Sequence, residues 1–477
     1  MTADSHDPRN SLPYAVRRLA RTYREAATWQ QLAVLAVSLL VYSATETTWI
    51  LAGTAFLLGI LFYLRLDLGL LLIAFTIPFA FTYKHIGADI VSLVEMLTVV
   101  CFAAWMALNV RAWTRSHGQG FKRINALDWG VLFFVATAFA SLLSAEDIDT
   151  ARWELRILVI EPALLYLMIR SSAAAHSSAA GGGAEDRQAL LPLADALVAG
   201  AVVVSILGLY QYFLTDYVEA VQGVRRILSI YDSPNHLSLY LGRVIPISLC
   251  VMAFGVTRWR RISHGLALIP LLLCLYLTYS RGAWLLGLPA ALIFIGLMRG
   301  HWGRILALGA LAATLLALVP IIRTPRIASL LTLQSGTNLS RLLLWRGTAR
   351  MLAEHPILGV GLGNFMRQYP RYMLREAGHE PVVFHPHNLL LDTWTSLGIP
   401  GLAALAWIQV AFFWVGFQLY RRLTTEPELQ ALTLGLMASM ISFLAHGLVD
   451  TGFRLTDLAF VFMLTLGLVR RIGAILD

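Results

Sequence analysis

The chain is built from long, continuously apolar runs separated by short polar turns. Each run extends over about 17–24 residues, the length at which a helix crosses the hydrocarbon core of a bilayer. Because backbone polar groups in lipid must be satisfied internally, only helices and closed barrels span membranes. Continuous rather than alternating apolar residues favour helices, so the pattern predicts an all-α, polytopic integral membrane protein with about 12–14 transmembrane helices. The expected spans cover residues 30–43, 48–63, 67–83, 90–110, 127–143, 153–169, 190–213, 236–256, 264–279, 283–298, 304–322, 389–419, 429–449 and 456–469.

Basic residues at the ends of these runs predict the orientation, because Lys and Arg concentrate in cytoplasmic turns. They occur at nearly every turn that must lie inside, including 111–123 and 258–261. We therefore expect cytoplasmic termini in a bacterial inner membrane, and 12 spans if two of the short first three do not cross. The longest polar segment then faces the periplasm and is long enough to form helices of its own. The expected divisions are a basic segment 1–29, helices 30–322, the periplasmic loop 323–388 and helices 389–477.

Composition agrees with this class. Hydrophobic residues make up 58% and charged residues 14% of the 477 residues, against about 45–50% and about 25% in soluble domains. The mean hydropathy is +0.68. The three cysteines lie in apolar runs, so neither a disulfide framework nor a metal-binding cysteine cluster is predicted.

The long loop and its neighbours carry arginines on the side where the charge rule does not require them. Arginine binds phosphate through a planar, permanently charged fork, so the pattern favours a phosphate-bearing ligand at the outer surface. The alternative is a solvated basic face that touches anionic lipid headgroups. The arginines expected outside are Arg225, Arg226, Arg281, Arg323, Arg326, Arg341, Arg346, Arg350, Arg367, Arg371 and Arg375.

Arg281 lies between two apolar runs, next to Ser280 and Gly282. An arginine at a helix end can extend its charge to the membrane interface. Gly282 allows close approach of a ligand to the backbone, and Ser280 adds a hydrogen-bond donor. These neighbours make Arg281 a candidate ligand-binding residue.

The loop ends in His385-Pro386-His387-Asn388, just before an apolar run. Proline fits the first position of a helix, so we expect His385 near the N-cap and His387 in the first turn. The helix N-terminus disfavours imidazolium, and neutral imidazole can accept a proton. His387 is therefore a candidate general base for a sugar hydroxyl, or else an N-terminal hydrogen-bonding histidine. Residues two apart on a helix do not share a face, which argues against a metal site here.

Two further motifs have structural as well as functional interpretations. In 232–236, Ser233 and Pro234 predict a helix start, whereas the adjacent Arg225-Arg226 pair favours a binding role for Asn235 and His236. The glycines of 359–363 follow no strand and lack the Gly-Lys-Ser/Thr of a nucleotide loop. We expect a helix exit and tight turn there, with exposed backbone amides.

Taken in order, these motifs resemble the O-antigen ligase and polymerase superfamily of bacterial membrane glycosyltransferases. The resemblance covers residues 225–401 and rests on an ordered set around one large loop. Its elements are Pro234-Asn235-His236, Ser280-Arg281-Gly282, Arg341-x-x-x-Trp345, Pro356–Phe365, His387-Asn388-x-x-x-Asp392 and Leu397–Gly401.

The resemblance implies an undecaprenyl-diphosphate-linked glycan donor and transfer without metal, nucleotide cofactor or nucleic acid. It implies His387 as the base, and Arg281 with Arg225 or Arg226 as the residues that bind the diphosphate. Asn235, His236, Arg341, Arg346, His385 and Asn388 are supporting candidates. In the ligase branch the acceptor is a sugar hydroxyl of the lipid A core.

Three alternatives stay open. About 14 spans is typical of polymerases that join lipid-linked repeats, whereas a single large late loop is typical of ligases. A protein O-oligosaccharyltransferase would use the same donor. A transporter or flippase for an anionic lipid would place charges deep within the spans. The ionisable residues are expected to cluster at one face, which favours a surface reaction.

Overall fold

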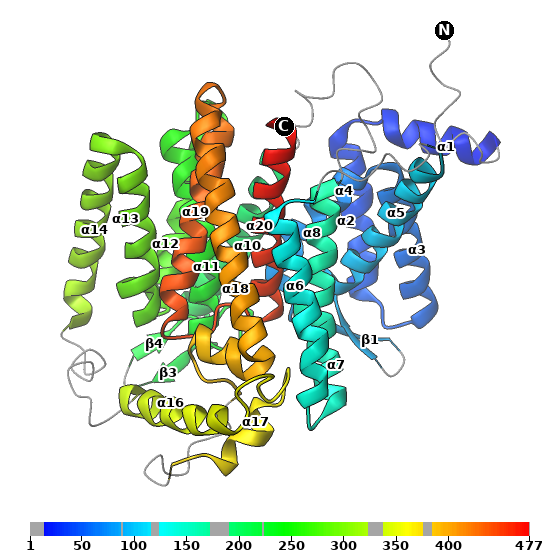
Figure 1. Cartoon of the computed structure of the whole chain (residues 1–477). Coiled ribbons are helices and arrows are strands. Elements are labelled where there is room, and N and C mark those ends of the chain that lie inside the picture. The colour runs from blue at the N-terminus through cyan, green and yellow to red at the C-terminus, as the bar shows by residue number, and fades with distance from the viewer. Residues whose placement is uncertain are drawn as a thin grey trace.

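The computed structural model describes residues 14–86, 89–115, 124–171, 190–221, 224–322, 337–374 and 384–476 of the 477-residue chain. In this part of the chain, long helices form one bundle (Figure 1). The helix α1, Tyr14–Glu25, and the end of α20, Thr456–Leu476, lie at one end of the bundle. The helices α16, Thr337–Glu354, and α17, Phe365–Gln368, lie across the opposite end, which we call the loop end.

The remaining elements follow the apolar runs closely. Each of the fourteen expected spans falls on a helix or on a series of consecutive helical segments. Their bounds are α2 Thr28–Ala44, α3 Thr48–Leu64, α4 Leu66–Thr76, η2 Ile77–Phe79, β1 Tyr83–Ile86, β2 Asp89–Ser92, α5 Leu93–Arg115, α6 Ala126–Ser141, η3 Leu142–Ser144, α7 Ile148–Glu154, η4 Leu155–Ile160, α8 Glu161–Ser171, α10 Leu191–Leu214, β3 Glu219–Val221, β4 Val224–Arg226, α11 Pro234–Phe254, α12 Arg258–Leu277, η6 Ala283–Gly287, α13 Leu288–Met298, α14 Gly300–Ile322, η7 Tyr369–Arg371, α18 Leu389–Arg422, η9 Leu423–Thr425 and α19 Pro427–Gly447.

The all-α, multi-pass membrane class is confirmed. Among the described residues, eight helices are long and apolar enough to cross a bilayer. The other expected spans fall on shorter apolar helices, on α2, which is bent by 114° against α1, and on the charged run α7–η4–α8. The eight long helices are Leu93–Val110, Ala126–Ser144, Leu191–Leu214, Pro234–Phe254, Arg258–Leu277, Leu389–Thr425, Pro427–Gly447 and Thr456–Leu476.

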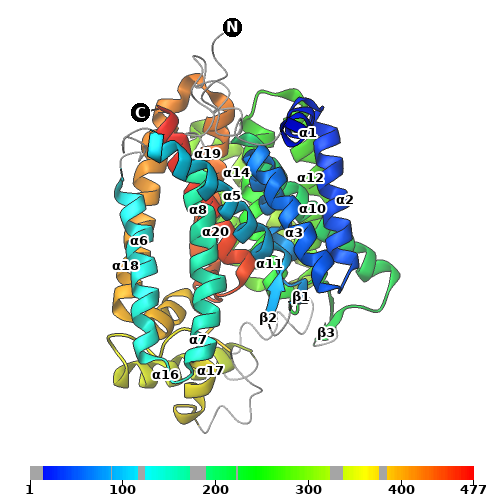
Figure 2. The same cartoon turned by 90° about the vertical axis from the view of Figure 1, so that its right-hand side faces the viewer.

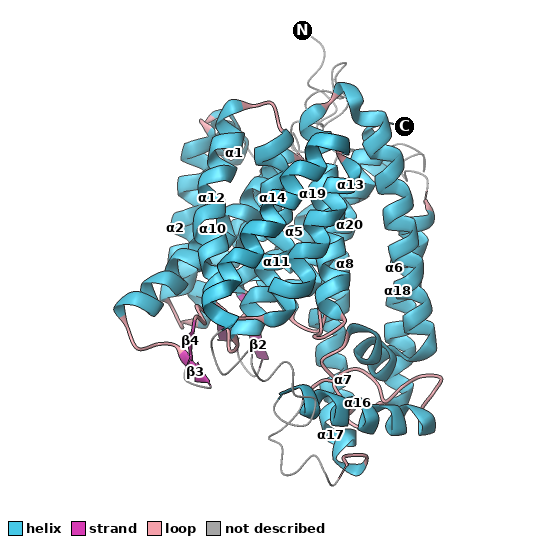
Figure 3. Ribbon diagram, turned by 90° about the vertical axis from the view of Figure 1, so that its left-hand side faces the viewer, coloured by secondary structure: helices cyan, strands magenta, loops and turns pink. Residues whose placement is uncertain are grey.

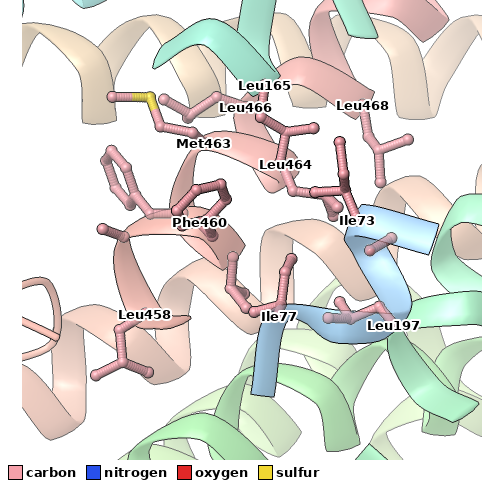
Figure 4. Close-up of a cluster of buried hydrophobic side chains, with 14 of the residues drawn as sticks. Ile73, Ile77, Leu165, Leu197, Leu458, Phe460, Met463, Leu464, Leu466 and Leu468 are labelled. Carbon is pink, nitrogen blue, oxygen red and sulfur yellow. The ribbon is translucent and has the colours of Figure 1, made fainter. Parts of the chain in front are cut away.

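The core is centred on α20, which is buried along almost its whole length. Its side chains Phe460 and Leu464 are inaccessible to solvent. Around them pack Ile73 of α4, Leu165 of α8 and Leu197 of α10, so α20 joins the two halves of the bundle (Figure 4). Burial of such side chains stabilises the fold by about 1.5–3 kcal/mol each in water, whereas in lipid close packing replaces the hydrophobic term.

Two short hairpins at the loop end were not expected from the sequence (Figure 3). The strand β1 pairs antiparallel with β2, and β3 pairs with β4 in the register Glu219–Arg226. Both hairpins lie in polar turns. Their strands have only three or four residues, which is too short for an alternation of polar and apolar residues to be recognised in the sequence.

Buried charges occur at both ends of the bundle, so the expectation that they gather at one face is wrong. At the end opposite the loop, Asp128 of α6 forms an ion pair with Arg170 at 2.7 Å and accepts a hydrogen bond from Arg470 at 2.9 Å. Within α11, Arg243 is also buried, with Nε 3.2 Å from Ser439 Oγ and its guanidinium over the Phe443 ring. The partners come from distant helices, which the sequence pattern does not pair.

Candidate active site at the loop end

The start of α18 positions the histidine motif. Asn388 is the N-cap, because its Oδ1 accepts from the amides of Leu390 and Leu391, each at 3.0 Å. Its Nδ2 donates to the Leu448 carbonyl at 2.8 Å. The expectation that His385 lies near the N-cap and His387 in the first helical turn is therefore wrong. The asparagine caps more effectively, and His387 precedes it with a φ of 48°.

His387 contacts an aspartate that sequence reasoning missed. Its Nδ1 lies 3.0 Å from Oδ1 of Asp450, in the turn between α19 and α20. The His387 side chain is 35% exposed, whereas that of Asp450 is 6% exposed. No described residue is a hydrogen-bond partner of the other ring nitrogen, Nε2. The imidazole is thus fixed at Nδ1 by a buried carboxylate and accessible to a ligand at Nε2.

Two further nitrogen-bearing side chains face the same carboxylate. His385 Nε2 lies 3.8 Å from Asp450 Oδ1, and Arg341 Nη2 lies 3.8 Å from Oδ2. The His385 and His387 rings are 4.2 Å apart. Trp345 holds this segment against α16 by donating from Nε1 to the Pro386 carbonyl at 2.9 Å. The structure therefore brings His385, His387 and Arg341 together.

These contacts change the protonation of the cluster. Burial opposes ionisation of Asp450, but His385 and His387 outweigh it and hold the pKa of the carboxyl well below its usual value. For His385, burial lowers the pKa, although Asp450 acts in the opposite direction. Asp450 is thus ionised at neutral pH, and the imidazole of His385 is held towards its neutral form.

His385, His387 and Asp450 together have the donor set of a metal site. One ligand atom each from His385, His387 and Asp450 lies within 4.8 Å of the others. The helical spacing argument against such a site is wrong, because residues 385–388 are not helical. Two imidazoles and a carboxylate suit a transition metal, although Arg341 adds a positive charge that opposes cation binding.

The turn that carries Arg281 packs beside this cluster. A Cβ placed on Gly282 would lie 2.5 Å from the ring of His446, and one on Gly447 would lie 3.0 Å from Leu389. The end of α19 is therefore in close contact with both the Arg281 turn and the start of α18. Only a residue without a Cβ allows this approach of the Arg281 turn to α19.

The two adjacent arginines at β4 have different surroundings. Arg226 is buried, and it donates to the Thr278 carbonyl at 2.8 Å, to Glu219 at 2.6 Å and to Asn235 Oδ1 at 2.8 Å. It thus holds the turn that leads to Arg281. Arg225 is exposed and donates to the carbonyls of Tyr212 and Thr215 at the end of α10. Of the two arginines, only Arg226 has a hydrogen bond to the turn that leads to Arg281 in the described chain, through the Thr278 carbonyl.

Three other predicted candidates, Asn235, His236 and Arg346, do not belong to this cluster. The helix start at Ser233 and Pro234 is confirmed, with Ser233 Oγ accepting from the Asn235 amide. His236 is buried, with Nε2 2.9 Å from Asp457 Oδ1. Arg346 lies on the exposed face of α16, and in the described chain it forms no hydrogen bond or ion pair with the His387 cluster.

The glycine motif is confirmed as a turn after α16, but it does not leave all its amides exposed. The Val360 amide donates to the Thr395 carbonyl at 2.7 Å, and the Ile399 amide donates to the Ile357 carbonyl at 2.9 Å. Gly359 has a φ of +67° and Gly398 one of +70°, where α18 bends. These two hydrogen bonds connect the turn to α18 at its bend. The turn therefore holds α18, the helix that follows the His387 segment, in position.

A second buried network of polar side chains connects α18 with the turn that carries Asp450. Arg454 donates to Glu154 of α7 at 2.8 Å and to Ser396 of α18 at 3.1 Å, and lies 3.4 Å from Asp392. Asp392 also accepts from Thr451, next to Asp450, at 2.7 Å. Arg454, Glu154, Asp392 and Ser396 border a small cavity of about 30 Å³, room for about one or two waters. In the sequence, Asp450 and Arg454 look like ordinary charges of a short turn.

The comparisons with known proteins concern part of the chain that forms this site. Residues 266–406 match the model of the family described as O-antigen ligase. Over these residues the chain is similar to that family. The matched region includes Arg281, α16, the glycine turn and His387, whereas Arg226 and Asp450 lie outside it. The family implies a ligase- or polymerase-type membrane glycosyltransferase with a lipid-linked glycan donor and a glycan acceptor. No curated protein matches the chain.

Proposed function

We propose that the protein transfers an O-antigen-type polysaccharide from undecaprenyl diphosphate to a sugar hydroxyl of the lipid A core at the periplasmic face of the inner membrane. The observation that carries this proposal is the half-exposed imidazole of His387, held at Nδ1 by buried Asp450 beside the Arg281 turn. A base, a cationic clamp and access from the bilayer are the parts that the reaction needs.

The chemistry follows from the tautomer. With Asp450 ionised, His387 donates from Nδ1 and has a lone pair at Nε2. Nε2 accepts the proton of the acceptor hydroxyl as its oxygen attacks the anomeric carbon. The bond from that carbon to the diphosphate breaks on the opposite side, which inverts the configuration. The electron pair leaves with undecaprenyl diphosphate, whose charge Arg281, with Arg226 or Arg225, stabilises. Neither metal nor nucleotide takes part.

A lipopolysaccharide gel of a deletion strain tests this proposal. We expect loss of long chains with accumulation of lipid-linked polymer, restored by wild type and not by His387→Ala. A single-repeat ladder would instead identify a polymerase, and an unchanged gel with altered glycoproteins would identify a protein glycosyltransferase. In a purified assay, transfer should persist after exhaustive EDTA treatment; its loss, restored by a divalent cation, would contradict the metal-independent mechanism.

One observation favours the transporter alternative. Arg243 lies nine residues into α11 and is buried, and intramembrane charges often mark transport pathways. Uptake of a fluorescent undecaprenyl-diphosphate analogue into proteoliposomes would test it. We expect no difference between wild type and Arg243→Gln, because the reaction that we propose takes place at the loop end.

A further inference from the structure

The arginines of the long loop differ in their partners. Arg367 and Arg371 each lie 3.3 Å from Glu146, and Arg367 also lies 3.3 Å from Asp147. These contacts attach the loop to the α6–α7 turn. Arg323, Arg326 and Arg375 lie outside the described residues. Structural contacts thus account for part of the loop's charge.

Arg346 and Arg350 are the contrasting pair. Both are exposed, and no acidic side chain of the described chain pairs with either. They lie four residues apart on α16, so their Cβ atoms are about 5–6 Å apart on one face. Two guanidinium forks at this spacing can bind one phosphate together.

The pair borders a groove of about 560 Å³, within the range of about 300–1,000 Å³ typical of small-ligand sites. Ala349 and Ala353 leave room between the arginines, and the apolar wall is made by Leu343 and Leu374. A cationic pair beside a small apolar wall suits a phosphorylated sugar, whose ring has an apolar face.

The groove lies on a different face of α16 from the His387 cluster. Arg341 faces Asp450, and five residues further along a helix correspond to a rotation of about 140°. A helix is about 10 Å across, so a ligand in the groove is separated from His387 by about the width of α16. A diphosphate bound beside His387 would have to extend around α16 to reach this face.

A lipid headgroup suits this face less well. An amphipathic helix that lies on a bilayer presents large apolar residues to the lipid. The exposed face of α16 instead presents Arg346, Ala349, Arg350, Ala353 and Glu354, with Leu342 only 38% exposed. Larger residues such as Leu344 and Met351 pack inward against Phe365 and Tyr369. The views in Figures 1 and 2 both place α16 across the end of the bundle.

We propose that Arg346 and Arg350 form a binding subsite for a phosphate group on the acceptor glycan. The identity of the occupant as acceptor rests on the proposed function, whereas the phosphate chemistry rests on the groove itself. The Trp345–Pro386 hydrogen bond connects the same helix to the His387 segment, so a bound acceptor is held at a fixed position relative to the base.

Binding of delipidated core oligosaccharide to the purified protein, without donor, tests the subsite directly. We expect the phosphorylated oligosaccharide to bind at least about tenfold more tightly than the phosphatase-treated one. The double variant Arg346→Gln/Arg350→Gln should lose this preference, and Arg152→Gln, an exposed arginine of α7 on the same end, should keep it. Equal binding of both oligosaccharides to wild type, or an unchanged preference in the double variant, would overturn the proposal.

Two further experiments distinguish binding at the subsite from the transfer reaction and from binding of a lipid headgroup. In the transfer assay, the double variant should raise KM for the phosphorylated acceptor at least about tenfold, with the donor KM and kcat unchanged. If wild type binds the oligosaccharide but transfers nothing to it, the proposed function fails while the subsite stands. In nanodiscs, binding of oligosaccharide should not depend on phosphatidylglycerol; abolition by this lipid would identify a headgroup site and overturn the acceptor assignment.

Discussion

Two histidine–aspartate pairs at opposite ends of the bundle have the same nitrogen–oxygen distance and different surroundings. His387 lies 3.0 Å from Asp450 at the loop end, and His264 lies 3.0 Å from Asp195 at the other end. The His387 side chain is 35% exposed, whereas that of His264 is 3% exposed and its other nitrogen contacts Ser248 Oγ at 3.1 Å. A paired imidazole is therefore not enough to indicate a base; one ring nitrogen must also remain accessible.

The largest expected difference between the pairs is in transfer rate. His387→Ala should lower kcat by about 10²–10⁴-fold, the usual contribution of a general base. His264→Gln should lower the melting temperature but leave the activity of the folded protein unchanged. Transfer of lipid-linked glycan, normalised to the monodisperse fraction, measures both. Near wild-type transfer by His387→Ala would contradict its role as the base.

Removing the orienting carboxylate should have a smaller effect. A charge-assisted hydrogen bond contributes about 1.5–3 kcal/mol, so Asp450→Asn should lower kcat roughly 10- to 100-fold. The KM for donor should change little, because Asp450 is buried and contacts His387. Asp195→Asn is the matched change at the other end. An equal loss of activity in both variants would show that the effect is structural.

The bend in α18 offers a test of how the loop end is held. A Cβ on Gly398 would meet the Ile357 carbonyl oxygen at 1.9 Å, in a backbone with a φ of +70°. Gly398→Ala should therefore destabilise the protein by at least about 1–3 kcal/mol and displace the glycine turn. Gly53→Ala is the control, because nothing lies within 4 Å of a Cβ there. Thermal unfolding in detergent, followed by transfer activity, measures the difference.

The smallest expected effect is a pH dependence of stability at His385. Because folding lowers its pKa from 6.5, the folded state binds fewer protons than the unfolded one, and stability falls as the pH drops below about 6.5. Asp450, whose pKa is lowered from 3.8, contributes no change in this window, since it stays ionised in both states. His387, Arg341 and Asp392 also face this region.

The melting temperature of wild type should therefore decrease between pH 7.5 and 5.5, and that of His385→Gln should decrease less. His355→Gln, which changes another loop histidine beside Tyr372, should keep the wild-type slope. Parallel slopes in wild type and His385→Gln would show that His385 does not contribute this dependence.

The sequence by itself determined the class and the positions of the helices. Apolar runs depend only on local composition, so all fourteen fall on helical segments. The helix start at Ser233 and Pro234 was also predicted from a local motif. The exact start of α18 was not, because Pro386 and Asn388 both suit a helix start, and the contacts of Asn388 with the backbone decide between them.

Only the tertiary structure decided which charges act together. Asp450 and Arg341 are separated by 109 positions in the sequence. Arg341 lies on α16 and Asp450 on the turn before α20, and no periodic pattern in the sequence connects them. Local sequence likewise gave Arg225 and Arg226 equal weight, but the β3–β4 hairpin exposes one and buries the other against Thr278. Helix formation is a local property of the chain, whereas the burial and pairing of charges depend on which helices pack side by side.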